Sequence, residues 1–337
     1  MRKLALVLGL ATLAADALAQ GPAASPAAAA GATTATIPDP IALGDRIDVD
    51  GGKHLKGMGK IIVPTVIVRL ATRGSLTVVN QGRFFETDAK TAKAKGRFVV
   101  AGLDKEYVQG LAKQLQDDYV ARLRSLGYTV LTYDDIKDDP EVVGMKRYKP
   151  DGDYGMPTGG PTGSKNTYLM AFPSDAQAID PPFQGYGWGF RKIAKAMDAG
   201  LMVPEYVIDA PLLTGSKKHG VSSRGASVSV FPEMTLSAYV PIATAKGGWG
   251  SIRMKSAVGD LGDAVGEIGD AKDDSPRFAN AIASGLSQLG SLGADLQSKS
   301  GIWGMKVARP AYTAAVLRGA ISFNMAAAQA IAAEKGK

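Results

Sequence analysis

The sequence predicts an α+β protein, in part α/β-like, with a mixed or antiparallel sheet packed by two or three helices and a helical C-terminal extension. Short runs rich in Val, Ile and Leu, bounded by Gly and Pro, recur through the first 250 residues, as strands do. Between them lie a few segments with apolar residues at steps of three and four, as in amphipathic helices. The chain of 337 residues, 45% of them hydrophobic, is long enough to bury a large core without disulfides or metals.

The first 19 residues carry the pattern of a secretory signal peptide. Arg2 and Lys3 precede an apolar stretch from Leu4 to Ala15, and Ala17-Leu18-Ala19 is a small-x-small cleavage site. The apolar stretch is shorter than the roughly 20 residues of a membrane span, although a retained N-terminal anchor is the alternative. We therefore expect a periplasmic or secreted protein.

Composition divides the rest of the chain into three parts. Residues 20–40 are almost entirely Ala, Gly, Pro, Ser and Thr, which predicts a flexible leader. Residues 41–250 hold the predicted α/β body, and residues 251–337 form a Gly- and Ala-rich helical extension.

The body opens with three predicted strands. These are the apolar runs Ile61–Leu70, Leu76–Glu86 and Arg97–Leu103, for which three antiparallel strands are the simplest arrangement. Pro64 has no N–H group for a sheet ladder, so it indicates an edge or a bulge in the first run.

A helix, a strand and a short helix should follow. Asp104 can cap a helix whose apolar residues recur at steps of three and four from Val108 to Leu126, and Gly127 should end it in a left-handed conformation. Tyr128–Tyr133 then alternates as a strand, and Asp134-Asp135-Ile136 starts a short helix.

The second half of the body predicts a helix at Arg191–Ala199 and a strand at Leu201–Leu213. Two further strands are expected at Ala226–Phe231 and Met234–Ile242, the second with one buried face made by alternate residues. Lys217-Lys218-His219 is expected in the turn before them.

Two helical patterns mark the C-terminal extension. Val258, Leu261, Val265 and Ile268 are spaced by three, four and three residues, and a similar series runs through residues 278–296. Pro310 should start a last helix, Ala311–Glu334, which docks on the sheet or on another subunit. A homo-oligomer is therefore one possible assembly.

Composition also excludes several classes of chemistry. The chain has no Cys, which removes thiol nucleophiles, thiolate metal sites and disulfides. Its only histidines, His54 and His219, cannot form a three-histidine metal site. We therefore expect no metal and no cofactor. A non-catalytic protein is favoured over an enzyme.

Two segments are candidate binding elements. Phe183–Phe190 places four aromatic rings on a glycine-rich backbone, where they either close over a core or grip a sugar, a peptide or a bilayer interface. The lysines and arginine of residues 90–97 either form a solvated hairpin tip or attract an anionic partner. The candidate binding residues are Phe183, Tyr186, Trp188, Phe190, Lys90, Lys93, Lys95 and Arg97.

Three functions remain open at this point. The first is an envelope protein that binds or scaffolds a protein, a glycan or an anionic lipid or polymer, with peripheral membrane contact possible. The second is a basic protein, of net charge +7, that binds acidic polymer or lipid; the aromatic residues are too few for specific nucleic acid binding. The third is a hydrolase of an extracellular glycan or other polymer that uses two carboxylates from Asp134, Asp135, Asp153, Asp175, Asp180 and Glu205.

The order of parts resembles one known module. Residues 121–130 followed by Asp134-Asp135-Ile136, and then residues 193–203 running into a strand and a hairpin, resemble the periplasmic α/β module of the curli-secretion protein and related bacterial envelope lipoproteins. The resemblance covers residues 60–245, without the lipidated Cys. It implies a non-catalytic scaffold of the envelope, and it assigns no individual functional residue.

Overall fold

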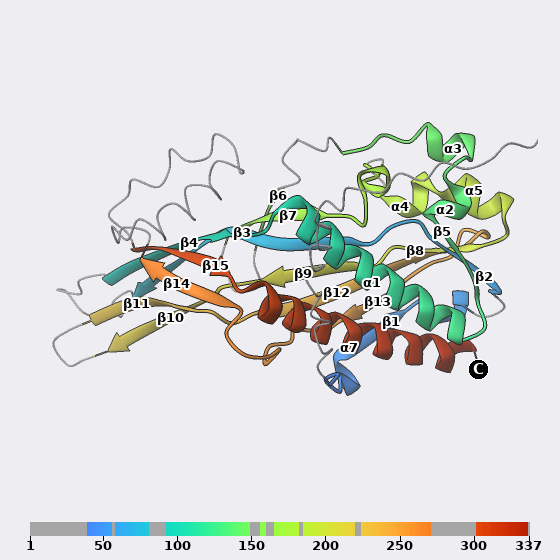
Figure 1. The fold of residues 1–337 in the computed structure, drawn as a ribbon. Helices are drawn as coiled ribbons and strands as arrows, with labels where there is room; N and C mark the ends of the chain where they lie inside the picture. Colours follow the sequence, from blue (N-terminus) through green and yellow to red (C-terminus); the bar gives the residue numbers. More distant parts are fainter. Residues whose placement is uncertain are drawn as a thin grey trace, which may run out of the picture. The chain divides into compact units, whose positions relative to one another are not determined.

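A computed structural model describes residues 39–55, 58–80, 92–148, 156–159, 165–181, 185–219, 224–270 and 301–335. In this part of the chain, 13 strands form one mixed sheet and two further strands form a separate hairpin (Figure 1). Helices pack on both faces of the sheet, so the predicted α+β class and mixed sheet are confirmed.

The elements have the following bounds. The strands are β1 (Ile47–Asp50), β2 (Lys60–Val63), β3 (Ile67–Asn80), β4 (Ala92–Ala101), β5 (Thr129–Thr132), β6 (Met156–Gly159), β7 (Lys165–Ala171), β8 (Gly200–Met202), β9 (Glu205–Asp209), β10 (Leu212–His219), β11 (Arg224–Phe231), β12 (Thr235–Ala243), β13 (Trp249–Met254), β14 (Gly266–Asp270) and β15 (Gly301–Val307). The helices are α1 (Lys105–Ser125), α2 (Tyr133–Ile136), α3 (Pro140–Val143), α4 (Tyr186–Gly189), α5 (Arg191–Ala196) and α7 (Arg309–Lys335), with short 3-10 turns at Gly44–Arg46, Gly52–Leu55 and Asp175–Gln177.

The sheet brings distant parts of the sequence side by side. Its main strand order is β14-β15-β4-β3-β9-β12-β8-β2-β5. Strands β9 and β8 pair with one edge of β12, and β13, which pairs with β1, lies on its other edge. In the same way, β4 and β9 pair with one edge of β3, and β7, which pairs with β6, lies on its other edge. The pairs β15–β4, β3–β9, β2–β5 and β2–β8 are parallel, and the other pairs are antiparallel.

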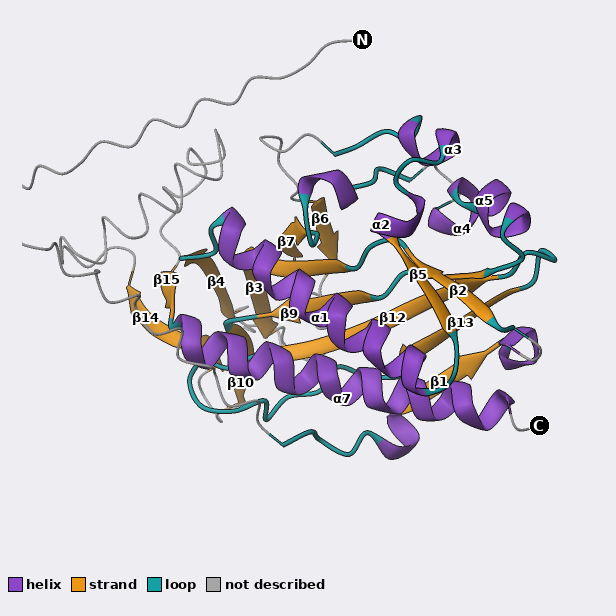
Figure 2. Cartoon of the chain, turned by 45° about the vertical axis from the view of Figure 1, so that its right-hand side comes forward, coloured by secondary structure: helices purple, strands orange, loops and turns teal. Residues whose placement is uncertain are grey.

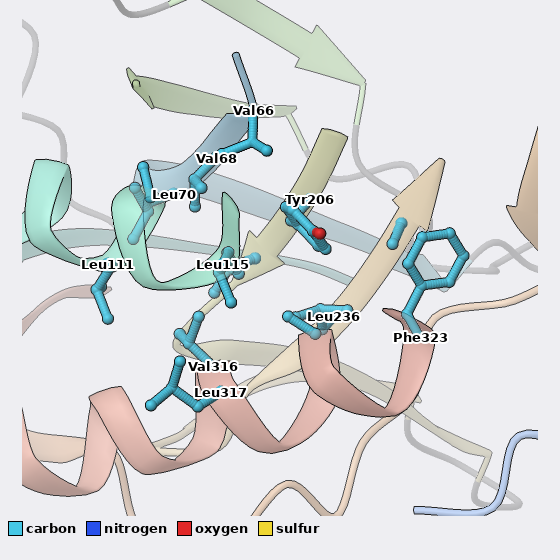
Figure 3. Packing of buried hydrophobic residues seen from close by; sticks show 14 of the residues in the cluster. Val66, Val68, Leu70, Leu111, Leu115, Tyr206, Leu236, Val316, Leu317 and Phe323 are labelled. Carbon is cyan, nitrogen blue, oxygen red and sulfur yellow. The ribbon is translucent and has the colours of Figure 1, made fainter. Parts of the chain in front are cut away.

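The two long helices α1 and α7 cover one face of the sheet (Figure 2). The side chain of Asp104 accepts a hydrogen bond from the Tyr107 amide at 3.0 Å, and Gly127 follows the helix with φ 81°, so the predicted cap and stop of α1 are both confirmed. Leu111 and Leu115 of α1 and Phe323 of α7 are buried against the side chains of β3, β9 and β12 (Figure 3).

The opposite face of the sheet, here called the outer face, has a smaller cover. Helices α2, α3, α4 and α5 gather at one end of the sheet in Figure 2 and bury a second apolar cluster. This cluster includes Ile67 of β3, Phe172, Phe190, Ile193 of α5 and Leu201 of β8.

The hairpin β10–β11 covers the face that carries the long helices. Val228 of β11 packs against that core, and the amide of Asn80 donates to the Gly225 carbonyl at 3.0 Å. Gly215 lies where a Cβ atom would overlap Val78 of β3, so the close approach of the hairpin requires a residue without a side chain.

Several predicted boundaries were wrong. The run Ile61–Leu70 breaks at Pro64 into β2 and β3, and β2 pairs in parallel with β5 and β8 instead of extending an antiparallel meander. Pro204 likewise divides the run Leu201–Leu213 into β8 and β9. The antiparallel pairing of β3 with β4 is confirmed.

The region after residue 250 is less helical than predicted. The spacing of Val258, Leu261 and Val265 suggested a helix, but these residues lie in a connecting segment, and Ile268 lies in strand β14. Lys217-Lys218-His219 belongs to β10 and is not in a turn. Residues 278–296 lie outside the described residues.

The final helix is confirmed and belongs to the core. Strands β13, β14 and β15 and helix α7 join the same sheet and core as the earlier elements. By length and composition α7 could cross a membrane, yet 61% of its most apolar window is buried inside the protein, and a core helix meets the same criteria.

Candidate binding surface

The aromatic segment around α4 divides between core and surface. Phe190 is 1% exposed and packs among the residues of the outer-face cluster, so its ring is closed over a core. Trp188 is 47% exposed. The hydroxyl of Tyr186 donates to the carbonyl of Ile179 at 2.7 Å, and burial raises the pKa of this phenol. Phe183 lies outside the described residues.

Gly187 sets the position of this segment on the sheet. A Cβ atom at Gly187 would overlap Cζ3 and Cη2 of Trp249 in β13 and would lie 3.1 Å from the Cβ of Ala243 in β12. One edge of the Trp249 indole therefore lies directly against the α4 backbone, while 51% of the residue stays exposed. Trp188, the next residue, is held by the guanidinium of Arg191, which lies 5.2 Å from its ring centre.

A row of paired side chains crosses the outer face next to these rings. Tyr239 of β12, which is 41% exposed, lies opposite Arg253 of β13 on one side and Glu205 of β9 on the other. Arg253 pairs in turn with Asp48 of β1, and its Nε and Nη2 atoms donate to Oδ2 of Asp48 at 2.9 and 2.7 Å.

The row ends in a partly buried ion pair. Nε of Arg69 in β3 lies 2.5 Å from Oε1 of Glu205, with 15% and 26% of the two side chains exposed. Nη1 of Arg69 also contacts Sδ of Met170 in β7 at 3.1 Å. The guanidinium is therefore fixed by contacts from two neighbouring strands, β7 and β9.

Two of the six candidate acids approach the same tyrosines. Desolvation raises the pKa of Tyr148. The charges of Asp180 and Glu205 raise this pKa further, and Arg69 lowers it. Asp180 also forms a hydrogen bond with Tyr148. Asp180 and Glu205 also raise the pKa of Tyr186. The structure thus brings these two carboxylates to one cluster.

The other candidate acids have separate local roles. Asp134 lies 3.6 Å from Lys137, and Asp135 accepts hydrogen bonds from the amide and the hydroxyl of Thr132. Asp175 lies 2.6 Å from Lys105, and the hydrogen bond from Lys105 lowers the pKa of this carboxyl. Asp153 lies outside the described residues.

The surface made by these groups has nearly balanced charge. We call it the ring-and-ion surface. It holds four carboxylates and three guanidinium groups, for a net charge of −1, whereas the whole chain has +7. Its members are Trp188, Tyr239 and Trp249 with Asp48, Asp50, Asp180, Glu205, Arg69, Arg191 and Arg253.

The predicted basic residues lie elsewhere on the outer face. Lys93, Lys95 and Arg97 are part of strand β4, and the opposite face of this strand carries Phe98 and Val100 in the core. Arg97 lies opposite Ser75 of β3, whereas Glu205, beside Tyr239, lies opposite Ile67 of the same strand. Eight residues along β3 separate these two positions, or about 26 Å at the usual rise per residue. The structure therefore does not bring these cations to the aromatic rings, and Lys90 lies outside the described residues.

A hollow lies beside α7. Its volume is about 650 Å³, and aliphatic side chains such as Ile41, Leu43 and Met325 line it. The Ser322 hydroxyl at its wall accepts from the Ile41 amide at 2.7 Å and donates to the Arg318 carbonyl at 2.5 Å. The hydroxyl is thus used within the protein, and the hollow has less chemistry to orient a ligand than the ring-and-ion surface. Across the described ranges, no three His, Asp or Glu side chains are grouped to hold a metal ion.

No protein-family model, curated protein or solved structure matches this chain. The resemblance to the curli-secretion module therefore stays a prediction.

Sequence reasoning found part of this surface and missed the rest. It singled out Trp188 through its aromatic segment and Glu205 and Asp180 as acids. It missed Trp249 and Tyr239, although the alternation along residues 234–242 already placed Tyr239 on the face opposite the buried one. Trp249 has no comparable signal, because only the pairing of β13 with β12 brings it to α4.

Proposed function

We propose that this chain is a non-catalytic binding protein of the periplasm or the exterior, and that the ring-and-ion surface is where it meets its partner. One observation carries the proposal. Trp188, Tyr239 and Trp249 stay about half exposed on the outer face, while two long helices seal the other face. Exposed groups of large rings are costly in water and are typical of interaction surfaces.

Binding fits the ionic groups of this surface better than hydrolysis does. A carboxylate-based glycoside hydrolase needs one acid to protonate the leaving group and a second to act as base or nucleophile. Here Glu205 is engaged by Arg69 at 2.5 Å, and Asp180 forms a hydrogen bond with Tyr148. Both carboxylates therefore serve to fix neighbouring side chains.

The basic strand β4 supports a second, weaker contact with an anionic polymer or lipid. Lys93 and Lys306 of the adjacent β15 are exposed, and Lys95 and Arg97 are partly exposed. Attraction through such exposed charges acts over a Debye length of about 10 Å at 0.1 M salt and is weakened as salt rises.

The proposed function is tested with the purified full chain and an insoluble cell-envelope fraction. We expect Trp188→Ala combined with Trp249→Ala to weaken cosedimentation at least about tenfold, because aromatic hot spots dominate binding. Phe231→Ala is the matched control, since Phe231 is 40% exposed but lies on β11. Equal binding by the double variant, or an equal loss in the control, would contradict the proposal.

The cellular location of the protein is tested separately. Fractionation of the native host followed by N-terminal sequencing should find a chain that begins near Gln20 outside the cytoplasm. A cytoplasmic chain with Met1 intact would contradict the envelope assignment.

A further inference from the structure

We infer that the ligand of the ring-and-ion surface is an uncharged glycan chain, lying along β12 and β13. This inference rests on the proposed function and adds the chemical class of the partner. It is drawn from three features of the surface: the spacing of its rings, the form of its hydrogen-bonding groups and its local charge.

The rings form two separated platforms on neighbouring strands. Tyr239 lies opposite Arg253, whereas Trp249 lies opposite Ala243, so the two rings are offset by four residues, or about 13 Å along the strands. Trp188 lies beside the second platform through the contact of Gly187 with Trp249. Flat rings at intervals suit the alternating apolar C–H faces of sugar residues in an extended chain.

The polar groups on either side of the Tyr239 platform are paired in fixed geometry. Nε and Nη2 of Arg253 both donate to one oxygen of Asp48, so the second carboxylate oxygen and the Nη1 hydrogens can face a ligand. A pair of adjacent sugar hydroxyls can donate to that oxygen and accept from that guanidinium at once. The pair Arg69 and Glu205 lies on the other side of Tyr239. Nε of Arg69 donates to Oε1 of Glu205 and Nη1 contacts Met170, so Nη2 and the second carboxylate oxygen can face a ligand there.

The local charge favours a neutral ligand over the alternatives. The seven charged groups that define the surface sum to −1, so they hold no excess of cations for an anionic lipid or polymer, in contrast to strand β4. A protein partner is also less suitable, because the centre of a protein interface is depleted of charged residues, whereas here ion pairs flank Tyr239 on both sides. These other partners become outcomes of the test.

The test uses calorimetric titration of the full chain with cellulose-type, xylan-type and chitin-type hexasaccharides, alginate and vesicles of anionic phospholipid. We expect binding to at least one neutral hexasaccharide, weakened about tenfold or more by Tyr239→Ala and by Trp249→Ala. Arg253→Lys keeps the charge but loses the planar donor pair, so it should weaken binding severalfold. Phe231→Ala should change it less than twofold.

The outcomes separate this inference from the proposed function. Absence of binding to every neutral hexasaccharide, together with ring-dependent binding to the envelope fraction, would overturn the glycan assignment and leave the binding function standing. Loss of binding to the envelope fraction after protease treatment of that fraction would indicate a protein partner and would also overturn the glycan assignment. Preferential binding to alginate or vesicles that is removed by Trp249→Ala would indicate an anionic ligand and would also overturn the assignment of an uncharged glycan.

Discussion

The hydroxyl of Tyr206 in β9 donates to Oδ1 of Asn324 in α7 at 2.7 Å, with both residues fully buried. Nδ2 of Asn324 donates in turn to Asp118 of α1 at 2.9 Å. This short chain of hydrogen bonds joins the sheet to both long helices inside a mainly apolar layer. A buried polar group that loses its partner costs more than the hydrogen bond itself contributes.

The first prediction follows from this pair. Tyr206→Phe leaves Oδ1 of Asn324 without its donor, and we expect the free energy of unfolding to fall by about 1–3 kcal/mol in urea titrations. Combining Tyr206→Phe with Asn324→Leu should cost less than the sum of the single changes. Ser216→Ala is the control, because Ser216 makes its 2.7 Å bond to Ser227 at an exposed site. Additive losses would contradict the coupling.

The second prediction concerns the ion pair of Arg69 and Glu205. Glu205→Gln removes the negative partner of a guanidinium that is only 15% exposed, and we expect a loss of about 1–3 kcal/mol in the free energy of unfolding. Lys113→Ala breaks an ion pair whose side chains are both over 60% exposed, so its effect should stay within about 0.5 kcal/mol. A loss no larger for Glu205→Gln than for Lys113→Ala would refute the role given to this pair.

The third prediction uses two glycines. Gly187→Ala places a Cβ atom within the Trp249 indole, so we expect a lower melting temperature and a shifted tryptophan emission spectrum. Gly110→Ala meets open space on the exposed side of α1 and should stabilise the protein by about 0.5–1 kcal/mol, since Ala favours the helix. An unchanged emission spectrum in Gly187→Ala would argue against the contact of α4 with Trp249.

The fourth prediction concerns alkaline pH. Burial raises the pKa of Tyr119, Tyr206 and Tyr312. Tyrosines of the unfolded chain lose their protons near pH 10, while these three keep theirs in the folded state. Above about pH 10 the unfolded state therefore binds fewer protons, and stability should fall as pH rises; below that pH the contribution is fully present.

This pH dependence is measured by urea unfolding at several alkaline pH values, with tyrosinate absorbance followed in parallel. Tyr119→Phe should reduce the slope of stability against pH, because one buried phenol is removed. Ionisation of all 11 tyrosines while the circular dichroism stays native would be inconsistent with the burial of these rings.

Local sequence patterns predicted the elements that are locally determined. The cap at Asp104, the stop at Gly127, the alternation of residues 234–242 and the start of the last helix near Pro310 each depend on a few neighbouring residues. Spacing alone failed after residue 250, where Val258 bridges to Leu236 and Ile268 lies in β14. Apolar residues three or four apart arise in a segment that crosses the sheet as well as in a helix.

The ring-and-ion surface could not be predicted from local sequence patterns, because its residues are far apart in the chain. Arg69 and Glu205 are 136 positions apart, and they meet only because β3 and β9 pair in parallel. Gly187, the neighbour of Trp188, meets Trp249 because β13 pairs with β12 under α4. Each residue alone has an ordinary sequence context, so their relation appears only with the strand order.

The late position of α7 has a consequence for how the chain is made. Strand β15 must pair with β4, some 200 residues earlier, and α7 then closes the layer over β9 and β12. During synthesis the growing chain therefore exposes apolar sheet until α7 has left the ribosome. A stop codon before Arg309 should yield aggregates or degradation products rather than a smaller folded protein, and folding of the complete chain should be slow because its contacts join such distant segments.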